Sequence, residues 1–100
     1  MSELLVSTLG DDPELAELVD QYVAALSGRM EEIERAVSAG DRRRTEVLAH
    51  QIVGSAGMHG FRTIGEAARR VEDAAFGGSD DLLASSVREL AELCARARAR

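Results

Sequence analysis

The sequence predicts an all-α fold: an antiparallel, up-down-up-down four-helix bundle with a short N-terminal segment packed across one end. Apolar residues recur at helical spacing in four segments, and short stretches rich in glycine and aspartate separate these segments. No segment alternates between polar and apolar residues over a useful length, which argues against a sheet. Only 3% of the residues are aromatic, so leucine, valine, isoleucine and alanine must fill the core.

The chain of 100 residues is expected to form one domain, because this length supports a single modest hydrophobic core. The N-terminal segment covers residues 1–10, and the bundle covers about residues 12–98. The segment is too short for a confident helix but apolar enough to lie across one end of the bundle.

The first helix is expected from about Asp12 to Ser38. Asp11 or Asp12 can cap its start, Pro13 suits the first helical position, and Glu14 favours the positive end of the helix dipole. Its apolar stripe consists of Leu15, Leu18, Val19, Tyr22, Val23, Leu26, Met30, Ile33 and Val37. This stripe extends for about seven turns and predicts the longest helix of the bundle.

Three shorter helices follow. Ala39-Gly40-Asp41 ends the first helix and caps the second, which runs from about residue 42 to 58 and buries Leu48, Ala49 and Ile52. The third helix covers about residues 63–76, after a corner near Phe61. The fourth begins after residues 77–80 and continues to about residue 98, with Leu82 in its apolar stripe.

Composition excludes several classes of function. The net charge of -6 argues against nucleic-acid binding, which usually requires a basic surface. No run approaches the ~18 apolar residues of a membrane span, so no membrane association and a cytoplasmic location are expected.

His50 and His59 lack further ligands at suitable spacing, and no glycine-rich phosphate loop follows a strand, so neither a metal site nor a nucleotide site is predicted. The single Cys94 is expected in the core.

His50 is the main candidate functional residue. Within the second helix, Ile52 and Ala56 continue the apolar stripe, and His50 lies about 160° away from it, facing outward. The residues within about 60° of His50 on this helix are Arg43, Glu46, Val47, Val53, Gly54 and Gly57. Glycine within a helix costs about 1 kcal/mol relative to alanine, and Gly54 would leave room for another protein to approach the imidazole. Val47 and Val53 would form an apolar rim.

Three further residues are predicted to support this helix. If the second and third helices are antiparallel about Phe61, position 50 is level with position 72, and Glu72 can reach the imidazole; otherwise it is a solvated charge. Ser55 is expected to bond to the carbonyl of Gln51. His59 is expected to pack or cap at the corner between the two helices.

The chain resembles the histidine-containing phosphotransfer (HPt) domains of two-component phosphorelays. Their motif is roughly Ala-His-x-Leu-Lys-Gly-Ser-x-x-x-x-Gly, and the chain reads Ala49-His50-Gln51-Ile52-Val53-Gly54-Ser55 and then reaches Gly60. The likeness also includes Asp12-Pro13-Glu14-Leu15, the Ala39-Gly40-Asp41 break and the apolar spacing after Gly60, so it covers about 85 residues. One position differs, because Val53 occupies the place of the family's frequent lysine.

The resemblance implies a phosphoryl carrier, not an enzyme with its own substrate pocket. His50 would accept a phosphoryl group from a receiver-domain aspartate or a hybrid histidine kinase and pass it on, with Gly54, Ser55 and Glu72 in support. Arg43, Val47, Val53 and Gly57 would contact the partner. The chain itself would need no cofactor, since the receiver supplies Mg²⁺. Met1 favours a stand-alone protein, and a monomer is expected.

Two alternatives remain open at this point. The first is a helical adaptor that binds receiver or kinase domains without being phosphorylated, which the valine at position 53 allows because a cation there would offset phosphoryl charge. The second is a dimer formed through Val47 and Val53, in which His50 would be hidden.

Overall fold

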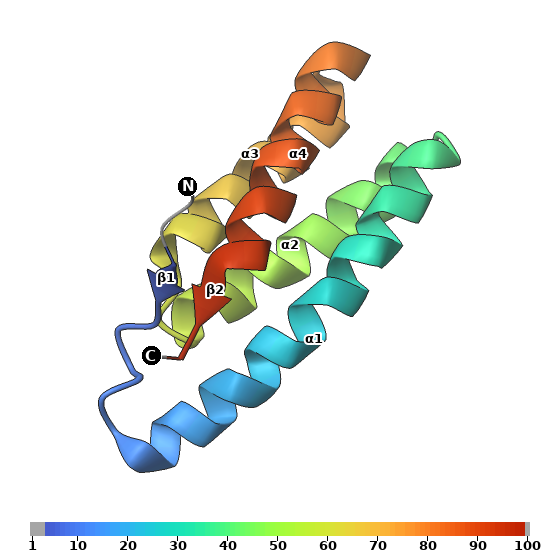
Figure 1. The fold of residues 1–100 in the computed structure, drawn as a ribbon. Helices are drawn as coiled ribbons and strands as arrows, with labels where there is room; N and C mark the ends of the chain where they lie inside the picture. Colours follow the sequence, from blue (N-terminus) through green and yellow to red (C-terminus); the bar gives the residue numbers. More distant parts are fainter. Residues whose placement is uncertain (1–3, 100) are drawn as a thin grey trace.

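The computed structural model describes residues 4–99 and consists mainly of four helices (Figure 1). The helices are α1 (Pro13–Ser38), α2 (Arg42–Met58), α3 (Arg62–Gly77) and α4 (Asp80–Arg96), and the two short strands are β1 (Leu5–Val6) and β2 (Ala97–Arg98). Figure 1 shows the chain reversing its direction at each of the three interhelical turns. The prediction of four helices is therefore confirmed.

Each helix begins where the sequence provides a capping group, with one exception. The side chains of Asp12, Asp41 and Ser79 accept hydrogen bonds from backbone N–H groups in the first turns of α1, α2 and α4. The start of α3 has no side-chain cap. Phe61 stands at its N-cap position, and its buried ring packs in the core instead.

Small side chains bring α2 and α3 into the most extensive interhelical contact of the structure. The α3 face that packs inward contains Gly65, Ala67, Ala68, Ala74 and Ala75, all of them buried. At Gly65 an added Cβ would lie 3.6 Å from the backbone oxygen of Val53. Because so little side-chain volume separates the two helices, long side chains along their seam can meet across it.

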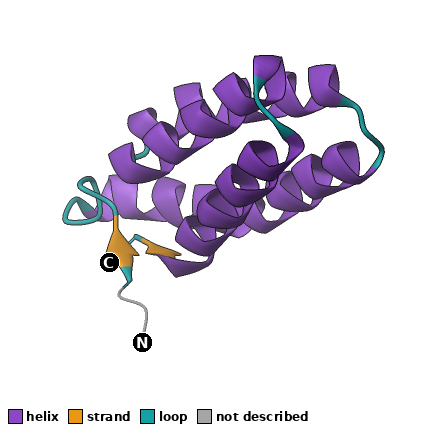
Figure 2. Cartoon of the chain, turned by 90° about the horizontal axis from the view of Figure 1, so that it is seen from above, coloured by secondary structure: helices purple, strands orange, loops and turns teal. Residues whose placement is uncertain are grey.

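The N-terminal segment is bonded at one end of the bundle. β1 and β2 pair in parallel, with Leu5 opposite Ala97, and Figure 2 shows both strands at this end. The Ser7 hydroxyl donates to the carbonyl oxygen of His59 at 2.6 Å, and the Thr8 N–H donates to that of Gly60 at 3.2 Å. These bonds join the segment to the α2–α3 corner. Residues 1–3 of the predicted N-terminal segment lie outside the described residues.

Three details differ from the sequence-based expectations. The structure contains a short pair of strands, although no strand was expected. The last helix was expected to continue to about residue 98 but ends at Arg96, because residues 97–98 pair with β1. Leu18 and Leu82, both expected in apolar stripes, are 54% and 52% exposed. Each lies at the edge of its stripe, where no neighbouring element covers it, whereas Ala16 turns out to be buried.

Candidate functional site

His50 lies in the middle of α2, on the side directed away from the core. Its neighbour Ala49 is fully buried and Ile52 is fully buried, which fixes the rotation of the helix about its axis. The imidazole is therefore held outward, and 72% of its side chain is exposed. A backbone anchored by two buried residues gives the exposed ring a defined position on the surface.

Glu72 of α3 contacts the imidazole directly. Its Oε2 lies 2.8 Å from Nδ1 of His50, while only 21% of the Glu72 side chain is exposed. An ionised carboxylate only accepts hydrogen bonds, so in the neutral ring Nδ1 carries the proton and Nε2 keeps its lone pair. No hydrogen bond of the described residues involves Nε2. The ring is thus oriented at one nitrogen and free for chemistry at the other.

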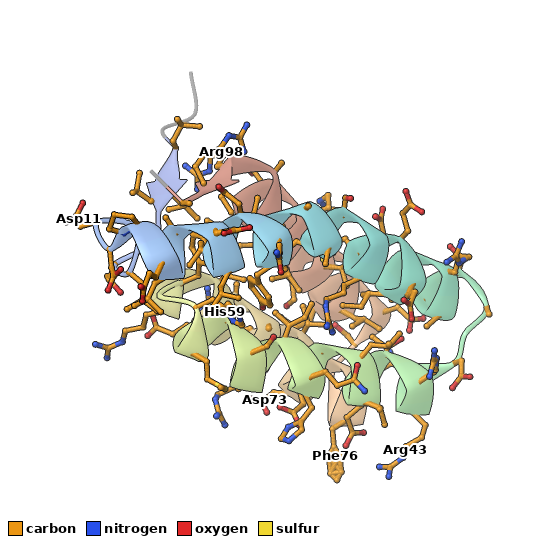
Figure 3. All side chains as sticks on the ribbon, turned by 90° about the horizontal axis from the view of Figure 1, so that it is seen from below. Asp11, Arg43, His59, Asp73, Phe76 and Arg98 are labelled. Atoms are coloured by element: carbon orange, nitrogen blue, oxygen red, sulfur yellow. The ribbon has the colours of Figure 1, made fainter. Side chains whose placement is uncertain are left out.

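An open hollow of about 390 Å³ lies beside this pair. It is lined by Arg43, Glu46, Val47, His50, Gln51 and Glu72. Arg43 is largely exposed and forms an ion pair with Glu46 at 3.6 Å. In Figure 3, Arg43 and Phe76 point away from the bundle, on the side where α2 and α3 lie. Phe76 is 73% exposed, and the sequence analysis did not place it at the site.

Of the other predicted site residues, supporting Gly54 and docking Gly57 are open, and the two docking valines differ from each other. A Cβ added at Gly54 or at Gly57 would meet nothing within 4 Å. Val47 is exposed, whereas Val53 is half-buried and packs against the core. The face of α2 that carries His50 consequently has no side chain at these two positions, and only part of Val53 reaches it.

Ser55 does not lie beside His50, although the two were grouped from the sequence. Five residues along a helix correspond to about 140° of rotation, and Ser55 faces α1, where its Oγ lies 2.7 Å from the hydroxyl oxygen of Tyr22. The predicted bond to the carbonyl of Gln51 was wrong, because the tyrosine hydroxyl provides the partner. Burial raises the pKa of Tyr22, and the hydrogen bond with Ser55 partly offsets this rise.

His59 packs and caps at the corner, as its position in the sequence suggested. Its ring stacks on Tyr22 with a centroid distance of 4.1 Å, and its Nδ1 lies 2.8 Å from the carbonyl oxygen of Ser55. Figure 3 shows His59 between α1 and α2. These contacts join α1 to the C-terminal end of α2, far around the helix from His50.

Arg42 has a role that the sequence analysis missed. In the structure its Nη1 donates to the carbonyl oxygens of Ala74 and Gly78 at 3.1 and 2.8 Å, and its Nη2 bonds to Asp80. The guanidinium therefore caps the negative end of α3 and fixes its register against α2. Only the antiparallel placement of these helices could reveal this contact.

The described residues include no cluster of three or more His, Cys, Asp or Glu side chains that could hold a metal ion. Cys94 is buried, and burial raises the pKa of its thiol to about 11. Among residues 4–99, no helix is both long enough and apolar enough to cross a bilayer. The reactive group that the geometry offers is thus the Nε2 atom of His50, which can act as a nucleophile in its neutral form.

Comparison with known proteins supports this interpretation at the level of the family. The family model of the Hpt domain matches residues 17–100. The match excludes the Asp12–Leu15 opening that belonged to the resemblance but includes the whole of α2, α3 and α4. Comparisons with curated proteins and with solved structures gave no match. Because the family model covers most of the chain, the chain belongs to the Hpt domain family, whose members take part in phosphotransfer within two-component phosphorelays.

Proposed function

We propose that this chain carries a phosphoryl group on Nε2 of His50, between receiver-domain aspartates or from a histidine kinase. The observation that carries the proposal is the 2.8 Å contact between Nδ1 of His50 and Oε2 of Glu72. It leaves the lone pair on Nε2 of an exposed ring, and this nitrogen is the one that an incoming phosphoryl group can meet.

The transfer step requires little from the chain beyond positioning. Nε2 attacks the phosphorus of an aspartyl phosphate, the P–N bond forms, and the P–O bond to the aspartate breaks, which releases a carboxylate on the donor. The ring then carries a positive charge while Nδ1 keeps its proton. The Glu72 carboxylate stabilises that charge through the same hydrogen bond, and onward transfer reverses these steps.

The surroundings of His50 suit a partner protein better than a small substrate. The hollow beside the imidazole is open, and the surface beyond Gly54 is bare. A receiver domain can therefore bring its aspartyl phosphate and its Mg²⁺ up to Nε2 without meeting a side chain at Gly54. Arg43, Val47 and Gly57 would border the contact, and the exposed part of Val53 would complete it. We expect a single-domain monomer that works in the cytoplasm.

The adaptor remains the second candidate because of one observation. Val53 contributes no charge at the position of the family's frequent lysine, and its half-buried side chain cannot neutralise a phosphoryl group. An adaptor of this kind would bind the same partners through the same surface but would not accept the phosphoryl group.

The deciding experiment is phosphoryl transfer from a radiolabelled phospho-receiver to the wild type and to His50→Gln. His59→Gln is the matched control, because it removes the other histidine of the chain. We expect label that is acid-labile and alkali-stable on the wild type and on His59→Gln, provided that the latter remains folded, and no label on His50→Gln. Label that persists in His50→Gln would refute the assignment. Binding without label across a panel of receivers would favour the adaptor.

A further inference from the structure

A phosphoryl group on His50 needs a positive charge close to it, and α2 does not supply one after the histidine. The position three residues beyond His50 is Val53, and the next turns contain Gly54 and Gly57. Arg43 lies two turns before His50, and its guanidinium is directed to Glu46. A cation for the phosphoryl oxygens is therefore more readily provided by a neighbouring helix.

Arg69 on α3 occupies a suitable place for this role. It lies four residues after Gly65, whose backbone approaches Val53, and three residues before Glu72, which contacts His50. On a helix these separations keep Arg69 within about 60° of both residues. Since Gly65 and Glu72 mark the edge of α3 that faces α2, the Arg69 side chain starts beside that edge, level with Val53.

Arg69 is also available, unlike the adjacent Arg70, which is paired with Glu89 of α4. Arg42, at the start of α2, is paired with Asp80. The ion pairs and hydrogen bonds found among residues 4–99 do not include Arg69, which is exposed. Three acidic residues lie within about one turn of Arg69 on the same side of α3: Glu66, Glu72 and Asp73. None of them forms an ion pair with Arg69 among residues 4–99.

Two positions on the α2 surface after His50, Gly54 and Gly57, have no side chain. Small residues keep the axes of α2 and α3 close together, and helix axes in such contacts lie about 8–10 Å apart. The bare backbone at Gly54 and Gly57 leaves space above α2 into which a long side chain from α3 can extend. A guanidinium in that space can donate two parallel hydrogen bonds to phosphoryl oxygens.

We propose that Arg69 supplies, from α3, the cation that stabilises the phosphoryl group on His50 and thereby replaces the missing lysine at position 53. The inference rests on the proposed function, since it requires a phosphorylated His50. It explains how a valine at this position is compatible with phosphotransfer.

The test uses phosphoramidate, which needs no partner protein: its P–N bond breaks, ammonia leaves, and a new P–N bond forms at Nε2. The full chain is compared with Arg69→Gln, with the rival Arg43→Gln, and with Arg62→Gln as the matched control, an exposed arginine at the start of α3. Two quantities are measured: the hydrolysis rate of the phosphohistidine, and the pH midpoint of its ³¹P signal. Circular dichroism and thermal unfolding show separately whether each variant keeps its fold, so a structural effect of a substitution is recognised.

We expect Arg69→Gln to raise the hydrolysis rate by roughly three- to tenfold and to raise the ³¹P midpoint by roughly half a pH unit, as loss of one exposed cation near a dianion predicts. Arg62→Gln should match the wild type, and Val53→Lys should restore Arg69→Gln. Unchanged values in Arg69→Gln, or a change in Arg43→Gln alone, would overturn the inference and leave the carrier function standing. A wild type that takes no phosphoryl group from phosphoramidate or from receivers would overturn both.

Discussion

Replacing Glu72 tests how the imidazole is oriented. The change is Glu72→Ala, which removes the acceptor 2.8 Å from Nδ1 of His50. A hydrogen bond to a charged group contributes about 1.5–3 kcal/mol, but 72% of the His50 side chain is exposed, so we expect about 1 kcal/mol. This corresponds to about a fivefold loss in the rate of phosphoryl transfer.

Glu72→Gln separates the hydrogen bond from the charge. Its amide oxygen can still accept from Nδ1, so the tautomer should persist while stabilisation of the charged ring declines. Asp73→Asn is the matched control, because it removes the adjacent exposed carboxylate from the same helix. The assays are transfer from a phospho-receiver and ¹⁵N chemical shifts of the imidazole, which report the protonated nitrogen.

The rates of transfer should decrease in a fixed order: wild type and Asp73→Asn fastest, Glu72→Gln intermediate and Glu72→Ala slowest. In Glu72→Ala the ¹⁵N shifts should indicate a mixture of tautomers. If Glu72→Ala keeps both the wild-type rate and the wild-type tautomer, the carboxylate does not orient the ring and the argument is refuted.

Three further substitutions test other parts of the structure. Gly54→Leu should raise the free energy of unfolding by about 0.5–1 kcal/mol through helix propensity, yet slow transfer from a receiver by roughly ten- to hundredfold because the new side chain displaces the partner; uptake from phosphoramidate should change little. Gly60→Ala should lower the free energy of unfolding, measured by chemical denaturation, by about 2 kcal/mol or more. The reason is that φ is 80° at this position and the new Cβ would lie 2.8 Å from the backbone nitrogen of Thr8. In the folded protein the Cys94 thiol has a pKa of about 11, against 9.0 for the free group. Its contribution to the free energy of unfolding is therefore fully present below pH 9 and is lost as the pH rises to 11, a decrease of about 3 kcal/mol. Cys94→Ala should abolish this decrease.

Each of these has a contrary result. Equal transfer rates from the receiver in Gly54→Leu and Gly54→Ala would mean that no partner approaches that surface. A Gly60→Ala variant as stable as the wild type would mean that the corner relaxes freely. A Cys94→Ala variant that loses the same stability as the wild type between pH 9 and pH 11 would assign the alkaline transition to other groups.

The sequence alone determined the helices and the outward position of His50. Local signals are sufficient for both: Asp12, Asp41 and Ser79 cap their helices through neighbouring N–H groups, and apolar spacing places Ile52 inward and His50 outward. These features depend on residues within a few turns of each other, so they can be read without knowing how the helices pack.

Packing between helices decided the details of the site. Whether Glu72 reaches Nδ1 depends on how closely α3 approaches α2, which the buried glycine and alanines of α3 set. The bond between Tyr22 and Ser55 and the cap formed by Arg42 also join residues more than 30 positions apart. The pairing of β1 with β2 joins the two ends of the described chain and interrupts the last predicted helix. Such contacts depend on interhelical distances and on which side chains come within bonding range of each other. Helical periodicity in the sequence carries no information about either.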